Sequence, residues 1–567
     1  MNEYYLSGET YAEMIKGGAA QLGKHRTAVN DLNVFPVPDG DTGDNMFMTI
    51  NAGVKRLEKE GSGSLGDVAR AISGGMLHGA RGNSGSILSR IFAGISKGFD
   101  SLETADIGLV KKAFSMGVAE AYNSVETPVE GTILTVYKDA VNYANSGSCA
   151  TLAEYFEDFT QELGRSLERT PTLLKVLMDA GVVDSGGAGL VYIAEGMKKA
   201  LSGEITDYNE LRPSSAKDTP DIDLDLFTED SRLTYGYCTE FLLRLQRAKT
   251  DIDCFDTAAF TAELKKLGNS VVAFSEGSIV KVHIHTEAPG EILNFAQKYG
   301  EFLTLKIENM SLQHSEVNSG SKAAEHGTNA PGSSPLTVPE KKSRPLPRKK
   351  YGIVSVAAGS GIIKLFEDLG CDTVVNGGQS MNPSVDDFIN AFEGVNAETI
   401  FVFPNNGNIY MTACQAAEFY KEAAVKVLRT KTIGEGYAGV SMINLEAESA
   451  DDIITELNDC IQGVVTGLVS KASRDAGGSV AVKKGDFIGF AEDIIYVDSP
   501  SRTAAAETLA EKLGLKSYDI AILIFGKDVP EEEADSVCSS LSGASRRTEI
   551  IKIDGGQPIY DYIIILE

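Results

Sequence analysis

The sequence predicts a multidomain protein with an all-α N-terminal domain, an α+β middle domain and an α/β C-terminal domain. Three hydrophobic patterns support this: helical spacing of apolar residues over 1–208, alternating apolar residues over 218–313, and alternating strand-like and helical segments over 351–567. The segment 314–350 is rich in Ser, Gly and Pro and then in basic residues, so we expect a disordered linker. A chain of 567 residues is long enough for several separate cores.

An acidic loop interrupts the helical pattern near the N-terminus. The stretch 33–45, Asn-Val-Phe-Pro-Val-Pro-Asp-Gly-Asp-Thr-Gly-Asp-Asn, carries Asp39, Asp41 and Asp44. Carboxylates this close repel one another unless a cation neutralises them, and Mg²⁺ or Ca²⁺ with oxygen ligands is the usual partner. A solvated acidic turn that caps the next helix would explain the same residues. An EF-hand is excluded because the twelfth position from Asp39 is Ile50 instead of Glu.

Three further loops rich in Gly, Ser or Thr each precede a helical pattern. They are Gly-Ala-Arg-Gly-Asn-Ser-Gly at 79–85, Pro-Val-Glu-Gly-Thr at 128–132 and Asp-Ala-Gly-Val-Val-Asp-Ser-Gly-Gly-Ala-Gly at 179–189. The free N–H groups of a helix's first turn, together with the helix dipole, form a site suited to phosphate. A plain interhelical turn would look similar. One acidic loop and three such loops in a helical frame indicate a metal-bound nucleotide.

These motifs resemble the ATP-binding domain of dihydroxyacetone-kinase-type proteins, and the resemblance implies an antiparallel helix barrel. The whole chain, with Gly-Gly-Gln-Ser-Met-Asn-Pro at 377–383 and Gly-Gly-Gln-Pro at 555–558, is most similar to the ATP-binding kinase subunit of bacterial fatty acid kinase. The resemblance implies ATP-dependent phosphorylation of a fatty acid carboxylate on a separate fatty-acid-binding carrier protein. The product would be an acyl phosphate for phospholipid synthesis. An acceptor that is already ionised needs no general base in this chain.

The resemblance also implies roles for individual residues. Asp39 and Asp41 would be the catalytic pair that holds Mg²⁺, with Asp44 and Asn33 as further magnesium ligands. The predicted nucleotide-binding residues are Thr42, Asn45, Gly82, Asn83, Ser84, Thr132, Asp184, Gly186 and Gly187.

Two positions depart from the family patterns. The dihydroxyacetone-kinase pattern has an additional Asp before the paired aspartates, whereas the nearest polar candidate here is Asn33, one residue further from the pair. Asp44 replaces the Thr that is usual in fatty acid kinase. The sequence leaves open whether Asp44 adds a metal ligand, caps the helix or weakens nucleotide binding.

A second candidate metal site lies in the middle domain. His283 and His285 are two residues apart on a predicted strand, so both imidazoles project from one face, and Cys238 lies in a segment that could pair beside them. Thiolate and imidazole ligands suit Zn²⁺ better than Mg²⁺. A buried thiol and two surface histidines would explain the same residues. The resemblance to the middle domain of fatty acid kinase favours a structural zinc, completed by Glu240 or water.

Composition limits the partners and the compartment. The formal net charge of −28 disfavours nucleic acid and anionic membranes as direct partners, because both would be repelled. Seven widely spread cysteines without a repeated spacing predict reduced thiols and a cytoplasmic location. The N-terminus has neither a basic nor an apolar leader region, and no stretch is long enough to cross a membrane, so we expect no direct membrane insertion.

The family resemblance further suggests a homodimer, and we expect the domain at 351–567 to recruit the carrier. The helical domain has loops for a nucleotide but no apolar run long enough for a fatty-acid tunnel. Two alternative functions remain compatible with the motifs. One is a kinase of dihydroxyacetone or another small polyol, and the other is a nucleotide-sensing scaffold that binds ATP without turnover.

Overall fold

A computed structural model of the chain divides into two compact units, Met1–Pro213 with Lys341–Glu567, and Ser214–Glu340. The residues that the structure describes are 4–33, 40–61, 63–204, 237–247, 249–250, 255, 257–276, 279–286, 288–309, 348–378, 382–477, 480–492 and 494–567. The predicted linker at 314–350 therefore falls almost entirely outside the described residues. Within the described ranges, no helix is both long and apolar enough to cross a bilayer.

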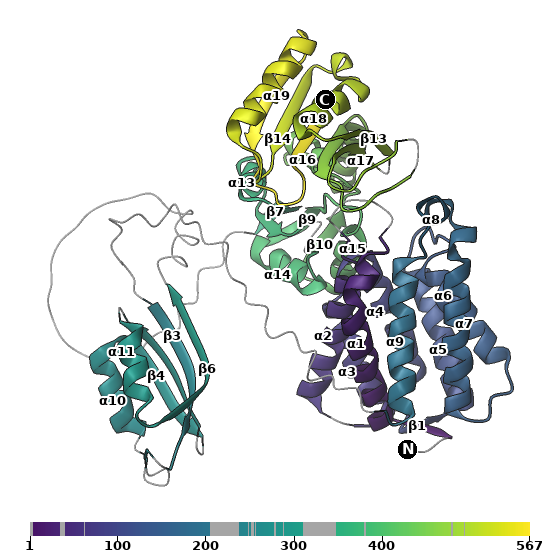
Figure 1. Ribbon diagram of the computed structural model, residues 1–567, viewed down its shortest axis with the longest axis vertical. Coiled ribbons are helices and arrows are strands. Elements are labelled where there is room, and N and C mark those ends of the chain that lie inside the picture. Colours follow the sequence, from purple (N-terminus) through teal and green to yellow (C-terminus); the bar gives the residue numbers. More distant parts are fainter. Residues whose placement is uncertain are drawn as a thin grey trace. The chain divides into compact units, whose positions relative to one another are not determined.

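The N-terminal region is mostly helical, as the sequence predicts, and its long helices run side by side (Figure 1). The elements are β1 (Tyr5–Ser7), α1 (Gly8–Asn30), α2 (Thr42–Glu60), α3 (Leu65–His78), α4 (Gly82–Gly98), β2 (Thr104–Asp106), α5 (Ile107–Asn123), α6 (Ile133–Ser146), α7 (Leu152–Leu173), α8 (Lys175–Ala180) and α9 (Ser185–Leu201).

The expectation of a purely α-helical domain misses one feature. Strands β1 and β2 pair antiparallel, with Leu6 opposite Ala105. Three-residue strands show too little periodicity to be distinguished from turns in a sequence. The helix starts follow local capping chemistry: Ser7 caps α1 and Asp106 caps α5, each by accepting a hydrogen bond from a backbone N–H of the first turn.

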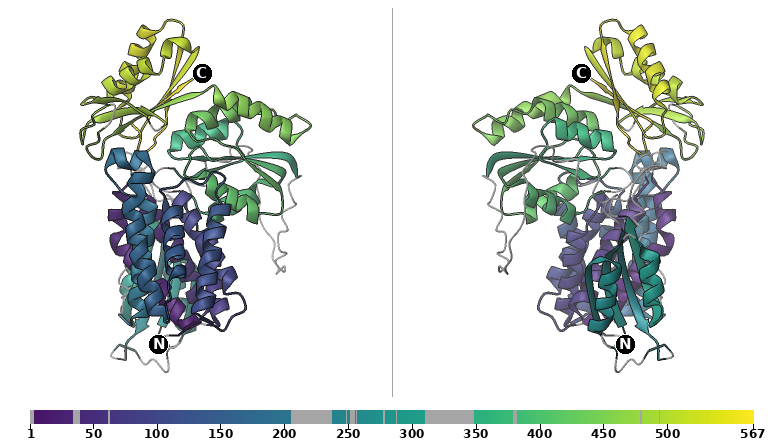
Figure 2. Two further views of the ribbon diagram at one scale, coloured as in Figure 1. Left: turned by 90° about the vertical axis from the view of Figure 1, so that its right-hand side faces the viewer. Right: turned by 90° about the vertical axis from the view of Figure 1, so that its left-hand side faces the viewer.

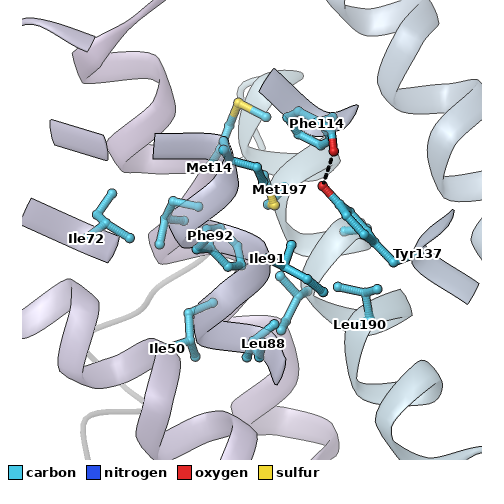
Figure 3. Packing of buried hydrophobic residues seen from close by; sticks show 14 of the residues in the cluster. Met14, Ile50, Ile72, Leu88, Ile91, Phe92, Phe114, Tyr137, Leu190 and Met197 are labelled. Carbon is cyan, nitrogen blue, oxygen red and sulfur yellow. Dashed lines mark hydrogen bonds between the residues drawn. The ribbon is translucent and has the colours of Figure 1, made fainter. Parts of the chain in front are cut away.

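One continuous apolar core joins these helices, and Figure 3 shows part of it. Ile50 and Val54, which follow the predicted helical spacing in α2, are fully buried. Tyr137 of α6 is buried among these side chains, and its hydroxyl donates to the backbone oxygen of Phe114 in α5 at 3.1 Å. A buried hydroxyl without a partner would destabilise the core, so this bond allows a tyrosine there. Helices α1 and α9 approach so closely that a Cβ on Gly196 would lie 2.2 Å from the carbonyl oxygen of Gly17.

The C-terminal region confirms the α/β prediction and contains two sheets (Figure 2). The first sheet has the order β10-β9-β7-β8, and all its strands are parallel. Its elements are β7 (Lys349–Ala357), α13 (Ser360–Asp368), β8 (Thr373–Asn376), α14 (Val385–Val395), β9 (Ala397–Phe403), α15 (Tyr410–Phe419) and β10 (Ala424–Val427).

The second sheet has the order β13-β12-β11-β16-β14-β15, in which only β14 and β15 pair in parallel. The remaining elements are α16 (Ile433–Met442), α17 (Ala450–Gln462), β11 (Val465–Lys471), β12 (Phe487–Ala491), β13 (Ile494–Ser499), α18 (Arg502–Lys512), a 3₁₀ turn at Leu515–Ser517, β14 (Ile520–Phe525), α19 (Glu531–Ala544), β15 (Glu549–Asp554) and β16 (Tyr562–Leu566). The central strands β14 and β16 are buried along almost their whole length, which explains their continuous apolar runs in the sequence.

The helical and C-terminal regions share one compact unit and contact each other through α3 and α4 on one side and α14 and α15 on the other. Gln415 of α15 donates to the backbone oxygen of Leu77 at 2.8 Å. The hydroxyls of Ser86 in α4 and Thr412 in α15 are 3.2 Å apart and buried. Ala80, at the start of α4, packs in the apolar cluster of the first C-terminal sheet. This contact places the C-terminal region next to the start of α4.

The middle unit consists of a four-stranded antiparallel sheet with the order β4-β5-β3-β6 and two helices packed on one face (Figure 1). Its elements are β3 (Tyr237–Leu245), α10 (Thr257–Leu267), β4 (Asn269–Glu276), β5 (Ile279–Thr286), α11 (Pro289–Ala296) and β6 (Gly300–Asn309). Alternate residues of β3 and β5, such as Phe241 and Val282, form the core with Phe260 of α10.

Candidate nucleotide site

The helices α2, α4, α6 and α9 begin close together at one end of the helical region. The Ser185 hydroxyl of α9 donates to the Thr42 hydroxyl of α2 at 3.2 Å. A Cβ on Gly82, the first residue of α4, would lie 2.7 Å from Nδ2 of Asn45 in α2. The Asp184 carboxylate accepts hydrogen bonds from the backbone N–H groups of Gly187 in α9, at 2.6 Å, and of Ile133 in α6. Four helix N-termini, each with a partial positive charge, therefore lie close together, and such positive charge favours the binding of phosphate.

The predicted metal ligands lie at the start of α2. Asp41 is the N-cap residue of α2 and is 9% exposed, and its Oδ2 accepts a hydrogen bond from Nδ2 of Asn382 at 2.6 Å. Asn33 accepts from the Thr42 hydroxyl through Oδ1 at 2.8 Å. Asn33, Thr42 and Ser185 thus form a hydrogen-bonded chain beside Asp41. Asp39 lies outside the described residues.

Asp44 is held by neighbours on α1. Its Oδ1 is 3.0 Å from Nε of Arg26, and its Oδ2 accepts from Nδ2 of Asn30 at 2.6 Å. Asn30 also accepts, through Oδ1, from the backbone N–H of Gly43 at 2.7 Å. These contacts indicate a role for Asp44 that the sequence did not suggest, which is to fasten α2 to α1, and the ion pair already compensates the carboxylate charge. Asn30 itself belongs to no motif, so the sequence contains no signal for its role in capping α2.

The predicted phosphate-binding side chains differ in their hydrogen-bond partners and in their exposure. Asn83 reaches the backbone oxygen of Gly407 in the C-terminal region at 3.4 Å, and its Oδ1 is buried without a hydrogen-bond partner among the described residues. The Thr132 hydroxyl donates to the backbone oxygen of Val129 at 2.8 Å and does not cap α6. Ser84 lies one residue further into α4 and is partly exposed.

Gly186 and Gly187 allow α9 to approach α6. A Cβ on Gly187 would lie 2.9 Å from Cγ2 of Val136, and one on Gly186 would lie 3.2 Å from Cβ of Ile133. The two glycines therefore serve the close packing of the two helix starts. This packing brings the first turn of α9 to the site.

Asp184 has a buried carboxylate at this junction. Its desolvation raises its pKa to about 6, although the hydrogen bonds from Gly187 and Ile133 act in the opposite direction by stabilising the charged form. The family resemblance implied that Asp184 is a nucleotide-binding residue. In the structure it caps α9 and ties that helix to α6.

The C-terminal region contributes residues that the sequence did not assign to this site. Asn382 contacts Asp41, and its backbone oxygen accepts from Nη1 of Arg81 at 2.5 Å. Arg81 also forms an antiparallel β-bridge with Ser384. Asn382 belongs to the Gly-Gly-Gln-Ser-Met-Asn-Pro motif at 377–383, which the sequence marked only as a family feature.

The residues of the predicted zinc site lie on neighbouring strands. In the antiparallel pairing of β3 and β5, Cys238 is opposite His285 and Glu240 is opposite His283. The side chains of all four residues lie outside the described part of the structure. Among the side chains that are described, no group of three or more His, Cys, Asp or Glu residues could hold a metal ion. The zinc site therefore stays a prediction.

Comparisons with known proteins agree with the motifs and cover almost the whole chain. Residues 36–199 match the DAK2 domain, residues 234–317 match the middle domain of FakA-like fatty acid kinase proteins, and residues 352–567 match the C-terminal domain of the same proteins. Protein YloV of Bacillus subtilis is 39% identical over 576 residues, which cover 99% of each chain. The chain belongs to the FakA-like fatty acid kinase family.

Other family members and solved structures are also similar. An uncharacterized protein of Staphylococcus aureus, SAB1090, is 36% identical over 99% of each chain. Among solved structures, DegV, a fatty acid binding protein from Bacillus subtilis, is 13% identical with a TM-score of 0.30. The fatty acid kinase B3 protein of Streptococcus pneumoniae loaded with linoleic acid is 12% identical with a TM-score of 0.27. Each match covers 38% of this chain and 99% of the other.

Because the pKa of Asp184 is raised in the folded chain, the free energy of unfolding should depend on pH. Between about pH 4 and pH 6 the folded chain binds a proton at Asp184 that the unfolded chain has lost, so this group's contribution to stability falls as the pH rises through that window. We compare the melting temperatures of the wild type and of Asp184→Asn. The difference, wild type minus variant, should increase as the pH is lowered from 7 to 4.5. The shift corresponds to at most about 3 kcal/mol. Thermal unfolding of both proteins without nucleotide tests this, and parallel pH profiles would contradict it.

Proposed function

We propose that this chain uses ATP to phosphorylate the carboxylate of a fatty acid presented by a separate fatty-acid-binding carrier protein. The observation that carries the proposal is the convergence of the starts of α2, α4, α6 and α9 around Asp41, in a member of the FakA-like fatty acid kinase family. Four helix dipoles and an acidic loop form a site for a polyphosphate that carries a divalent cation.

The donor atoms at this site suit Mg²⁺. The Asp41 carboxylate contacts Asn382, whose own amide oxygen, Oδ1, is buried and has no hydrogen-bond partner in the described part of the chain. Hard cations such as Mg²⁺ prefer oxygen ligands of this kind. We propose Asp39 and Asp41 as the magnesium-binding pair. Bound Mg²⁺ would neutralise phosphate charge as it develops during transfer.

The chain's own residues would bind and align the nucleotide. The first-turn N–H groups of α4 and α6, whose N-cap side chains make no capping bonds, would face the phosphates. A carboxylate oxygen of the fatty acid would form a bond to the γ-phosphorus while the bond from that phosphorus to the β,γ-bridging oxygen breaks, giving acyl phosphate and ADP. No proton has to be removed from an ionised acceptor, so alignment and charge neutralisation suffice.

We place the carrier against the C-terminal region, because the loops of the helical region serve the nucleotide. A homodimer and the use of the acyl phosphate in phospholipid synthesis stay predictions from the family, and a cytoplasmic location stays a prediction from the spacing of the cysteines. A kinase of dihydroxyacetone or another small polyol and a nucleotide-sensing scaffold are the competing functions, and the first experiment separates them.

ATP consumption with different acceptors tests the proposed reaction. We expect the full chain with Mg²⁺ to release ADP when a fatty-acid-loaded carrier is added, and to release little with the empty carrier or with dihydroxyacetone. Stoichiometric acyl phosphate, trapped with hydroxylamine, should accompany the ADP. Turnover with dihydroxyacetone would establish the polyol kinase, and nucleotide binding without turnover for any acceptor would establish the scaffold.

Asp41 and Asp44 provide a matched pair of variants, because both are aspartates at the start of α2 with different contacts. Asp41→Asn should reduce turnover by more than about 100-fold, since even groups that only orient a metal ligand cost 10–100-fold when replaced. Asp44→Asn should leave turnover near wild type and lower stability by about 1 kcal/mol or less, because its ion pair with Arg26 is partly exposed. Steady-state kinetics and thermal unfolding measure both effects. Normal turnover by Asp41→Asn, or equal losses in both variants, would contradict the assignment.

The zinc prediction is tested by elemental analysis of protein purified without chelator. We expect about one zinc per chain in the wild type, and its loss in His283→Ala with a lower melting temperature, because metal binding contributes to folding. His78→Ala is the matched control, since His78 contacts Asp386 at 2.7 Å in the other unit. ATP affinity should be unchanged in both variants. Absence of zinc from the wild type would favour the alternative of a buried thiol and two surface histidines.

A further inference from the structure

The motif at 377–383 brings a C-terminal residue into the nucleotide site of the helical region. Asn382 follows β8 and precedes α14, and its side chain is 1% exposed. Its Nδ2 donates to Oδ2 of Asp41 at 2.6 Å. The two residues are 341 positions apart in the chain, and their contact is buried. The function proposed above gives Asn382 no part in orienting Asp41.

The orientation of the Asn382 amide follows from its partner. An ionised carboxylate can only accept hydrogen bonds, so the NH₂ group must face Asp41 and the amide oxygen must point elsewhere. That oxygen, Oδ1, is buried and has no partner among the described residues. A hydrogen bond to a charged group is short and about twice as strong as a neutral one, and it restricts how the carboxylate can rotate.

The backbone of Asn382 and the start of α14 after it are fastened to the start of α4. Arg81, the residue before α4, donates to its carbonyl oxygen at 2.5 Å and lies 3.5 Å from the carboxylate of Asp387. Asp387 and Ser384 form a capping box at the start of α14. These contacts join the start of α14 to the start of α4. Asn382 is therefore held at the start of α4 by its own contacts and by those of the α14 residues that follow it.

Gly82 leaves the space that this contact needs. Its φ is +58°, and a Cβ there would lie 2.7 Å from Nδ2 of Asn45 and 3.0 Å from Nδ2 of Asn382. The amide of Asn45 comes from α2 in the helical region, and the amide of Asn382 comes from the C-terminal region. A side chain at this position would be strained and would displace one of them.

We propose that Asn382 is a positioning residue of the nucleotide site, which holds the Asp41 carboxylate in the orientation that the nucleotide-bound cation requires. The C-terminal region then completes the cation site in addition to any role in docking the carrier. This inference rests on the proposed function, because it assumes that Asp41 acts through a metal. It explains why an asparagine is buried against the start of α4 with its NH₂ group toward Asp41.

Binding of a fluorescent, non-hydrolysable ATP analogue to the full chain tests the inference without turnover. In Asn382→Ala the Mg²⁺ concentration needed for half-maximal analogue binding should rise about tenfold or more, because a hydrogen bond to a charged group is lost. Binding in EDTA should not change, since Asp41 contacts the nucleotide only through the cation. Asn382→Leu, which is similar in shape to asparagine, should behave like the alanine variant and controls for loss of packing.

Thr412→Val is the matched control at the same interface. It removes the buried hydrogen bond to Ser86 without touching Asp41, so the Mg²⁺ dependence should stay at the wild-type value. An unchanged Mg²⁺ midpoint in both folded Asn382 variants would overturn the inference, and so would equal shifts in the Asn382 and Thr412 variants. Failure of the wild type to bind the analogue at all would instead refute the proposed function.

Discussion

Bringing four helix starts together creates an electrostatic constraint that the rest of this structure has to satisfy. The positive ends of α2, α4, α6 and α9 repel one another. Asn30 and Asp184 accept from some first-turn N–H groups of α2, α6 and α9, whereas α4 has no side-chain cap, and the remaining N–H groups need acceptors. Asp41, the N-cap residue of α2, brings a buried carboxylate to the same place. A polyphosphate with its divalent cation would satisfy both sets of charges at once. The helix ends would bind the phosphates, and the carboxylate would bind the cation.

The packing of the helices makes this convergence possible, and it depends on small residues at the closest approaches. A Cβ on Gly43 would lie 2.3 Å from the backbone oxygen of Arg26, so only glycine lets α2 begin directly against α1. Gly187 has the same role between α9 and α6. Where a carboxylate takes part in the packing, as Asp184 does, backbone N–H groups compensate part of its charge and burial raises its pKa. The glycines of the ligand loops therefore serve the fold as well as any ligand.

The C-terminal region is a structural part of the same site. Polar contacts, including Asn382 with Asp41 and Gln415 with Leu77, accompany the apolar packing of Ala80 against the first sheet. Buried polar groups impose a specific geometry because an unmatched donor or acceptor costs free energy. The interface between the two regions is therefore specific, and it positions Asn382 and Ser384 beside Arg81 and Gly82. A kinase site built this way would be sensitive to whatever binds the C-terminal region.

The sequence by itself determined the regional fold classes, because helical and strand periodicities are local properties of short segments. The helical spacing around Ile50 and Val54 and the apolar runs of β14 and β16 all lie in the predicted kind of element. The sequence also located the loops that meet at the helix starts, since glycines and capping residues act within a few positions of themselves. The tertiary structure alone decided how these loops are completed. Asn30 caps α2 from another helix, Asp44 is paired with Arg26, and Asn382 reaches Asp41 from the C-terminal region. Such partners are distant in the chain, so no local pattern specifies them, and they become neighbours only when the packing of whole helices and sheets brings them together.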